Sequence, residues 1–217
     1  MPFHDLGFSV IALTLLIRGL MFPISHKMIR TQQVMKKIEP HVKEIRDSKK
    51  NKDEQAQAMM ELYRQHGINP FSGFFAILLQ FPVLIALYHV FFRGIPFNPA
   101  EVYSFITIPE NINVMFLGTI SLTSPNLVLA FLAALSQFFQ AKLSMPPDPS
   151  KKNATDLASA MQKQLPYILP VMIFIFGLKM PAAVALYWTA MNVFAIVHEA
   201  AVRKQALRRD AASNERH

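Results

Sequence analysis

The sequence predicts an all-α integral membrane protein with five transmembrane helices, and three observations support this fold class. Hydrophobic residues make up 52% of the 217 residues, whereas charged residues make up only 17%. A soluble domain usually carries about 25% charged residues, so this chain has little polar material for a water-facing surface. The apolar residues are gathered into segments near the length that crosses a bilayer, and the segments between them are rich in lysine and arginine.

The apolar segments are predicted to be transmembrane spans because about 20 apolar residues in a helix cross the hydrocarbon core. In chain order they are 6–25, 71–92, 125–141, 165–178 and 181–198. Lys179 and Met180 are nearly all that separates the last two spans, so these should form a tight helical hairpin. Residues 1–217 are therefore interpreted as a single membrane-embedded core.

The distribution of lysine and arginine predicts the orientation of the chain. The segment 26–66, the loop 142–163 and the tail 199–217 carry 19 of the 22 basic residues, whereas the connections on the opposite side hold only Arg93 and Lys179. Cytoplasmic connections carry the excess of basic residues. The N-terminus and the loop 93–124 are thus predicted to be outside, and the C-terminus inside. The net charge of +8 then belongs to the cytoplasmic face, and DNA is not an expected partner.

The segment 26–66 has a helical pattern of its own. Val34, Ile38, Val42 and Ile45 recur at helical spacing, and a charged turn separates them from a second apolar stretch. This pattern predicts an antiparallel helical hairpin in the cytoplasm. Its basic residues either dock onto the ribosome, the targeting machinery or anionic lipid, or only keep a solvated hairpin soluble. The candidate docking residues of the hairpin and the tail are Lys36, Lys37, Lys43, Arg46, Lys49, Lys50, Lys52, Arg203, Lys204, Arg208 and Arg209.

Arg18 is the most informative single residue, because it lies inside the first span among apolar neighbours. An arginine in the middle of a bilayer costs about 2.5–3.5 kcal/mol on insertion scales, so it needs a partner or water. The five predicted spans contain no aspartate or glutamate that could form an ion pair with it. Two interpretations stay open: Arg18 faces a hydrated polar cavity, or its side chain reaches back to the cytoplasmic head groups.

Polar and aromatic side chains in the other spans are candidates to line such a cavity. Gln137 and Gln140 are three residues apart and share one helix face. The alternative for each polar residue is an interhelical hydrogen bond worth about 0.6 kcal/mol. For Tyr187 and Trp188 the alternative is an aromatic belt at the membrane surface. The candidate residues of the substrate groove are Arg18, Gln80, Gln137, Gln140, Tyr187, Trp188, Thr189 and Asn192.

Signatures of enzymes and metal proteins are missing from the sequence. The chain has no cysteine, which excludes disulfides, thiolate metal sites and cysteine nucleophiles. Its seven histidines include no HExxH motif and no pair at ligand spacing. It has no nucleophile elbow, P-loop or dinucleotide-binding glycine pattern, and no acidic residue in a span for a proton relay. The sequence therefore predicts a protein that is not an enzyme and that uses no metal and no cofactor.

Motifs along nearly the whole chain, in the same order, resemble the YidC/Oxa/Alb membrane protein insertases. The matching blocks are Leu16-Ile17-Arg18-Gly19 with Phe22-Pro23, Ile38-Glu39-Pro40 with Lys43-Glu44-Ile45, Met59-Met60-Glu61-Leu62-Tyr63, Gly67-Ile68-Asn69-Pro70, Leu79-Gln80-Phe81-Pro82 with Ala86-Leu87-Tyr88, and Met180-Pro181-Ala182-Ala183 with Leu186-Tyr187-Trp188 and Asn192. The chain departs from the family in Phe71-Ser72-Gly73, where members often have leucine and glycines, and in Ala183, which is often glycine.

The resemblance implies a hydrophilic groove that contains Arg18, is open to the cytoplasm and to lipid, and is closed to the outside. It implies an insertase that moves short hydrophilic tails of client proteins across the membrane and releases client helices into lipid. Implied partners are nascent clients, the ribosome, signal recognition machinery and the Sec translocon. No transit peptide, N-terminal anchor span or periplasmic domain is visible, so a bacterial plasma membrane is expected rather than an organellar inner membrane. A small channel or transporter, or a non-catalytic membrane assembly subunit, remains the alternative.

Overall fold

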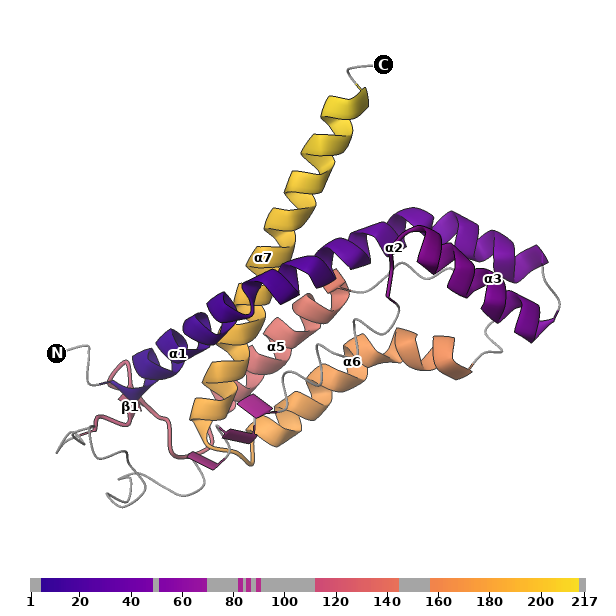
Figure 1. Cartoon of the computed structure of the whole chain (residues 1–217). Coiled ribbons are helices and arrows are strands. Elements are labelled where there is room, and N and C mark those ends of the chain that lie inside the picture. Colours follow the sequence, from indigo (N-terminus) through magenta and orange to yellow (C-terminus); the bar gives the residue numbers. More distant parts are fainter. Residues whose placement is uncertain are drawn as a thin grey trace.

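The computed structural model shows a mostly helical chain (Figure 1). It describes residues 5–48, 51–69, 112–144 and 157–214, and short helical stretches at 82–83, 85–86 and 89–90. The helices and strands are α1 (Leu6–Leu20), α2 (Phe22–Ser48), α3 (Lys52–Gln65), β1 (Met115–Phe116), β2 (Ile120–Ser121), α5 (Leu127–Ser144), α6 (Leu157–Gly177) and α7 (Ala182–Asn214).

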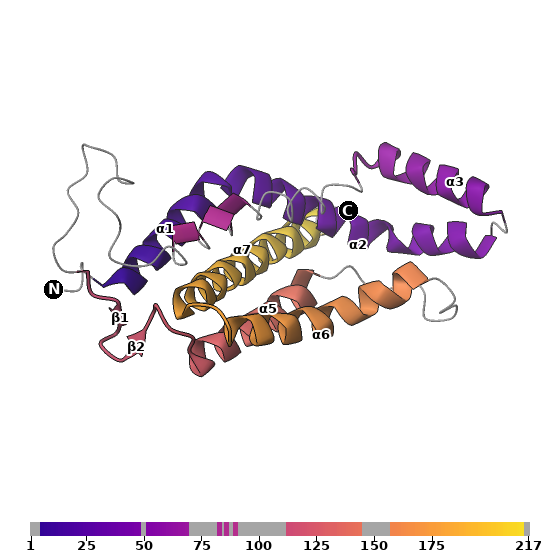
Figure 2. The ribbon, with the colours of Figure 1, turned by 90° about the horizontal axis from the view of Figure 1, so that it is seen from below.

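The helix α7 lies at the centre of the bundle. It packs against α1 and against α5, and α5 also packs along α6. Figure 2 shows α7 between α1 and the pair formed by α5 and α6. The helices α2 and α3 extend away from this bundle, and the C-terminal half of α7 projects from it in another direction (Figure 1).

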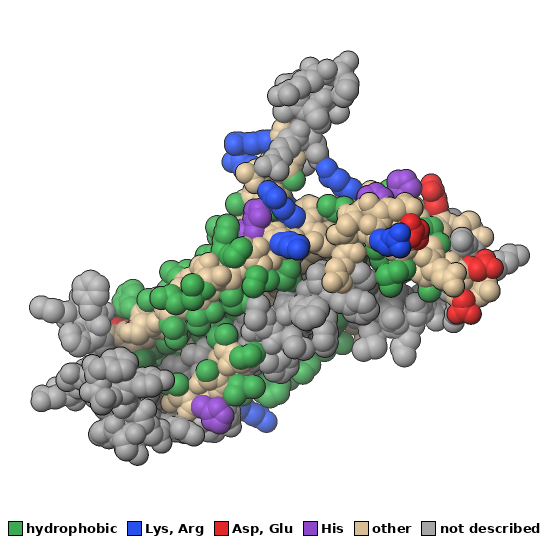
Figure 3. Space-filling model, in the orientation of Figure 1, with side chains coloured by type: hydrophobic (Ala, Val, Ile, Leu, Met, Phe, Trp, Pro, Cys, Tyr) green, Lys and Arg blue, Asp and Glu red, His purple; other side chains and the backbone are tan. Residues whose placement is uncertain are grey.

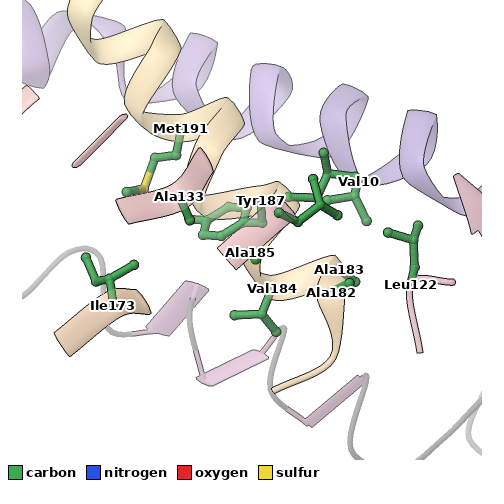
Figure 4. Close-up of a cluster of buried hydrophobic side chains, with 12 residues drawn as sticks. Val10, Leu122, Ala133, Ile173, Ala182, Ala183, Val184, Ala185, Tyr187 and Met191 are labelled. Atoms are coloured by element: carbon green, nitrogen blue, oxygen red, sulfur yellow. The ribbon is translucent and has the colours of Figure 1, made fainter. Parts of the chain in front are cut away.

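Small apolar residues of α7 form the centre of the core. Ala182 and Ala183 are fully buried, and Tyr187 is 3% exposed. They pack with Val10 of α1, Ala133 of α5 and Ile173 of α6, as Figure 4 shows. Small side chains let helices approach closely in a membrane, where van der Waals packing drives association. At Gly177, for example, an added Cβ would lie 2.9 Å from the Ala130 Cβ, so α5 and α6 touch there through small residues.

The predicted first span, 6–25, is two helices rather than one. The helix α1 ends at Leu20, α2 begins at Phe22, and the two are bent by 66°. Pro23 explains the break: it has no N–H to continue the ladder, and its ring clashes with the carbonyl four residues earlier. In the first turn of a new helix the same proline is well tolerated.

The fifth predicted span and the predicted basic tail form one continuous helix. The span was expected to end at His198, but α7 continues to Asn214. Alanine, glutamate, lysine, arginine and glutamine are good helix formers and make up most of residues 199–209. The tail is therefore a helical extension of the span as far as Asn214.

Helices that match the other predicted spans are described only in part. The helix α5 covers the third span, and α6 covers the fourth span and begins before it. The span 71–92, which includes Gln80, lies outside the described residues except for short helical stretches. Within the described part of the chain, α5 is the one helix that is by itself long and apolar enough to cross a membrane, and α1 with α2 qualifies only as a bent pair. The five-span topology thus remains a prediction.

One end of the bundle, which we call the β-hairpin end, is closed by residues 112–126. Asp5 caps α1 by accepting a hydrogen bond from the Gly7 N–H at 2.7 Å, and its second oxygen accepts one from the Leu117 N–H at 3.0 Å. Leu117 and Gly118 have positive φ values of 52° and 71°, which forms the tight turn between β1 and β2. Leu122 behind this turn is fully buried. Asp5 therefore ties the start of α1 to the β-hairpin.

The helices α2 and α3 form a hairpin with a small apolar core. Ile38, Val42 and Ile68 are buried there, and Met59 and Leu62 of α3 pack against them. The side chain of Asn51 caps α3 by accepting a hydrogen bond from the Asp53 N–H at 3.1 Å. The local pattern of apolar residues thus produces the antiparallel pair that it predicts, while its location in the cytoplasm remains a prediction.

Candidate functional site

Arg18 lies in the last turn of α1, on the side of the helix that packs against α7. The buried residues of α1 are Gly7, Val10 and Thr14, and Arg18 continues their helical spacing. Its side chain is half-buried, and no carboxylate among the described residues forms an ion pair with it. The helix dipole favours a cation in a last turn by about 0.3–1 kcal/mol. That is less than the cost of about 2.5–3.5 kcal/mol for placing an arginine in a bilayer centre, so polar surroundings are still needed.

Two polar residues of α7 supply part of those surroundings. Tyr187 packs in the buried core with Val10 of α1, and the ring of His198 stacks on Phe22, four residues after Arg18. Tyr187 and His198 are about three helical turns apart and so lie on one face of α7. Tyr187 is 3% exposed and His198 is 8% exposed. Arg18 therefore faces polar groups on α7 but no described group that neutralises its charge.

Aromatic rings fix the crossing of α2 and α7 beside Arg18. The rings of Phe22 and His198 stack with centroids 4.4 Å apart and an interplanar angle of 20°. The Nδ1 atom of His26 lies 3.4 Å from the Nε2 atom of His198. The rings of Phe194 and His198 are arranged edge to face, with centroids 6.1 Å apart. These contacts place α2 directly against α7, one turn beyond Arg18.

Hydrogen-bonded side chains run along the interface between α5 and α7, and we call them the α5–α7 polar chain. Trp188 Nε1 donates to Gln137 Oε1 at 2.8 Å, and Gln137 Nε2 donates to Gln140 Oε1 at 3.3 Å. Gln140 Nε2 donates to Ser144 Oγ at 3.0 Å, and Ser144 Oγ donates to Glu199 Oε2 at 2.5 Å. A helix rises 1.5 Å per residue, so this α5–α7 polar chain, from Trp188 to Glu199, extends over about 16 Å of α7.

The polar chain ends in an ion pair at the other end of the bundle, which we call the α2 end. Glu199 is 2% exposed, and its Oε1 accepts from an Arg203 nitrogen at 2.8 Å. Arg203 also donates to the Leu143 carbonyl oxygen, and so does Lys36 Nζ of α2, at 3.4 Å. Burial lowers the pKa of Lys36, the neighbouring Arg203 lowers it further, and Glu199 opposes both. The junction thus fastens α2 and α7 to the end of α5.

The predicted groove residues that belong to α7 lie on different sides of this helix. Trp188 and Asn192 face α5, where Asn192 Nδ2 donates to Ser136 Oγ at 3.2 Å. Tyr187 faces α1 and Arg18, about 100° around the helix from Trp188. Thr189 Oγ1 donates to the Ala185 carbonyl oxygen of its own helix at 2.8 Å. The structure therefore brings Gln137, Gln140 and Trp188 together, and it places Tyr187 on the side of α7 that packs against α1.

The predicted docking residues fall into three groups. Lys36 and Arg203 are half-buried and hydrogen-bonded within the molecule. Four side chains are exposed, namely Lys37, Lys43, Lys204 and Arg208. Arg46, Lys52 and Arg209 occupy helical positions whose side chains are not described, and Lys49 and Lys50 lie outside the described residues.

Glu199, Ser144, His26 and His198 belong to the site but were missed by the reasoning from sequence. Glu199 directly follows the predicted end of the fifth span, so a search for acids inside the spans passed it by. One signal was available, because Glu199 and Arg203 are four residues apart, the spacing of a helical ion pair. No sequence signal indicated that His26 and His198 would meet.

Comparison with known proteins gives one consistent result. The family model described as 60Kd inner membrane protein matches residues 2–209. The chain is similar to "Membrane protein insertase YidC" of Oceanobacillus iheyensis, with 32% identity over 203 residues that cover 91% of this chain and 74% of the relative. It is similar to "Membrane protein insertase MisCA" of Bacillus subtilis, with 30% identity over 88% of this chain and 67% of the relative.

Some relatives are much longer than this chain. "Membrane protein insertase YidC" of Magnetococcus marinus is 33% identical over 93% of this chain, but the match covers only 33% of that relative. "Membrane protein insertase YidC" of Wolinella succinogenes is 30% identical over 95% of this chain, and the match covers 35% of that relative. The match to the family model nevertheless extends over nearly all of the present sequence. The chain therefore belongs to the 60Kd inner membrane protein family, which is the YidC/Oxa family that its motifs resemble.

Proposed function

We propose that this protein is a membrane protein insertase that moves short hydrophilic tails of client proteins across a bacterial plasma membrane. The observation that carries the proposal is Arg18, a half-buried cation on the α7-facing side of an apolar helix without an ionic partner among the described residues. An isolated structural arginine would be expected to pair, since an unpaired intramembrane charge is costly and usually functional. The names of the relatives, each a membrane protein insertase, support the same activity.

The proposed topology is five spans with the N-terminus outside and the C-terminus in the cytoplasm. The β-hairpin end then faces outside, and the α2 end faces the cytoplasm. The sealed packing around Leu122 and Asp5 supports an outer end that is closed to water. The polar chain that ends at Glu199 supports an inner end that polar groups and water can enter.

The mechanism follows from the cost of moving polar groups through lipid. A hydrophilic tail loses its hydration when it enters hydrocarbon, and this cost opposes translocation. A groove that reaches partway from the cytoplasm shortens the dry distance, and Arg18 attracts acidic side chains of the tail. The membrane potential then draws each negative charge outward, by about 2.3 kcal/mol per 100 mV. The client helix leaves sideways into lipid and gains its own transfer free energy.

The experiment that tests this function is reconstitution of the protein into liposomes with a small single-span client, scored by protease protection of the translocated tail. Arg18→Lys should keep most insertion of an acidic-tailed client, because attraction over a distance needs only the charge. Arg18→Ala should slow that client and spare a client with an uncharged tail. Arg30→Ala, which removes an exposed cation of α2, is the matched control and should insert both clients normally.

Several outcomes would contradict the proposal. Equal losses for acidic and uncharged tails in Arg18→Ala would show that Arg18 maintains the shape or hydration of the groove instead of attracting charge. Normal insertion of both clients by Arg18→Ala would show that Arg18 is not needed for insertion. Insertion by the wild-type protein no better than in protein-free liposomes would favour a non-catalytic assembly subunit. Ion conductance by the purified protein would favour a channel.

The hairpin of α2 and α3 is proposed to be the docking element for the ribosome, signal recognition machinery, the Sec translocon or anionic lipid. Its apolar core is separate from the core of the bundle. Its removal breaks the hydrogen bond from Lys36 to the Leu143 carbonyl oxygen but leaves the bonds of Glu199 to Ser144 and Arg203 in place. Deletion of residues 36–63 should impair insertion while the remaining helices stay folded, as measured by circular dichroism. Full insertion by the deletion variant would show that the hairpin is dispensable.

A further inference from the structure

A pocket of about 650 Å³ lies between the start of α2 and the second half of α7. It opens on the side of α7 away from α5, and it shares no residue with the predicted groove. Figure 3 shows lysine, arginine and histidine side chains gathered near the place where α7 passes α2. Neither the proposed insertion mechanism nor the polar chain uses this pocket.

One end of the pocket is apolar and open. Phe22 and Val197 line it, and they are 44% and 64% exposed. Both residues fall within the predicted spans, the first and the fifth. In a membrane these side chains would contact acyl chains, since the burial of apolar surface away from water is favourable.

The opposite end of the pocket is cationic. Lys204 and Arg208 line it from successive turns of α7, and both are exposed. Like charges four residues apart on a helix repel each other, and an anion between them relieves this repulsion. His26 and His198 lie between the apolar and cationic ends, and no acidic side chain is among the described residues of the lining.

The order of these two ends matches the layers of a bilayer. The predicted spans end at Ser25 and His198, so Phe22 and Val197 lie at acyl-chain depth. Lys204 is six residues beyond His198, about 9 Å along the helix, and the head-group layer is about 5–7 Å thick on each side. Long cationic side chains reach back toward that layer. We propose that this pocket binds an anionic phospholipid, with its phosphate between Lys204 and Arg208 and its upper acyl chain along Phe22 and Val197.

This inference rests on the membrane placement in the proposed function but not on insertase activity. A free phosphate shares the anionic chemistry of the lipid but would leave the apolar end of the pocket empty. The apolar end therefore favours the phospholipid, and the experiment must separate the two sources. Its readout is lipid retention, so a failure here leaves the proposed insertion activity standing.

The test is native mass spectrometry of the full chain released from nanodiscs of equimolar phosphatidylglycerol and phosphatidylcholine. The wild-type protein should retain phosphatidylglycerol in preference. Each cation close to an anionic lipid contributes about fivefold in affinity, so Lys204→Gln with Arg208→Gln should reduce the preference by about 25-fold. The matched control is Lys27→Gln with Arg30→Gln, which removes two exposed cations of α2 outside the pocket and should keep the preference.

Three results would overturn the proposal. An equal loss in the control variant would show that the preference comes from overall charge. Displacement of the bound species by excess inorganic phosphate would show that the site holds an anion only. Equal retention of the two lipids by the wild-type protein would show that the pocket has no anionic preference.

Discussion

The β-hairpin end and the α2 end of the bundle are both tightly packed, but with opposite kinds of residues. At the β-hairpin end Leu122, Ala182 and Ala183 are fully buried, and the alanine N–H groups donate to carbonyl oxygens of Ser124 and Leu122. At the α2 end polar side chains are buried as well: Glu199 is 2% exposed and belongs to the series of hydrogen bonds that begins at Trp188.

This difference shows how one bundle can have a mainly apolar core at one end and buried polar side chains at the other. Backbone groups must be satisfied internally in lipid, and the β-hairpin end does this with backbone carbonyl oxygens and with the buried carboxylate of Asp5. The α2 end holds buried polar side chains that bond to one another, among them the ion pair of Glu199 and Arg203 at 2.8 Å. In the proposed mechanism, this difference gives a polar tail one end of the bundle at which to enter.

The largest effect is expected from breaking the apolar packing of the β-hairpin end. Leu122→Ala should lower the free energy of unfolding by about 2–5 kcal/mol, because it leaves a cavity at a fully buried position. Denaturant titration in detergent micelles measures this change. Leu127→Ala, at a position that is 63% exposed, is the control. Equal losses for both variants would contradict a sealed core behind the β-hairpin.

The corresponding change at the α2 end is Glu199→Ala. It removes the acceptor of the bonds from Ser144 and Arg203, and hydrogen bonds to charged groups are worth about 1.5–3 kcal/mol. The same titration should show a loss of that size. Glu61→Ala removes an exposed ion pair to Arg64 at 3.8 Å and should cost less than about 1 kcal/mol. A Glu199 variant as stable as the wild-type protein would show that the junction does not hold α5 and α7 together.

A smaller effect is expected at Asp5, which caps α1. Asp5→Ala should destabilise by about 0.5–2 kcal/mol, since both the Gly7 and Leu117 N–H groups lose their acceptor. Asp5→Asn should lose less than Asp5→Ala, because its one side-chain oxygen can still accept from the Gly7 N–H whereas its NH₂ group cannot accept from the Leu117 N–H. Equal losses in the two variants would contradict a role of the Gly7 cap. The titration in micelles applies here too.

The smallest effect is expected within the polar chain. Trp188→Phe removes the donor to Gln137 and should cost about 0.6 kcal/mol, the average for an interhelical hydrogen bond in a membrane protein. A double-mutant cycle with Gln137→Leu isolates this pair. A coupling energy of zero would indicate that water serves both groups equally well.

The helical elements could be predicted from the sequence much better than the contacts between them. The spacing of Val34, Ile38 and Val42 predicted the hairpin of α2 and α3, since it is local information. The bend at Met21 was missed although Pro23 marks it, because the apolar run continues through the break. The helical tail was missed because its charges were read for orientation and docking, and the helix propensity of residues 199–209 was not considered.

The candidate site could be predicted by residue type but not by partner. Gln137 and Gln140 were correctly placed on one helix face, but which helix they would meet depends on packing. Trp188 and Tyr187 are adjacent in sequence and end up on different sides of α7, facing Gln137 and Arg18 respectively. Glu199 could not be assigned to Ser144 without the fold, since the two residues are 55 positions apart.

The most direct test of the asymmetry between the two ends is labelling of single introduced cysteines with an impermeant maleimide. The chain has no cysteine of its own, so every signal comes from the chosen position. Thr119→Cys in the β-hairpin turn should label in intact cells. Ser48→Cys in α2 and Gln140→Cys in the polar chain should label only in inverted membrane vesicles. Labelling of Gln140→Cys or Ser48→Cys in intact cells would contradict the account, because the polar end would then face outside.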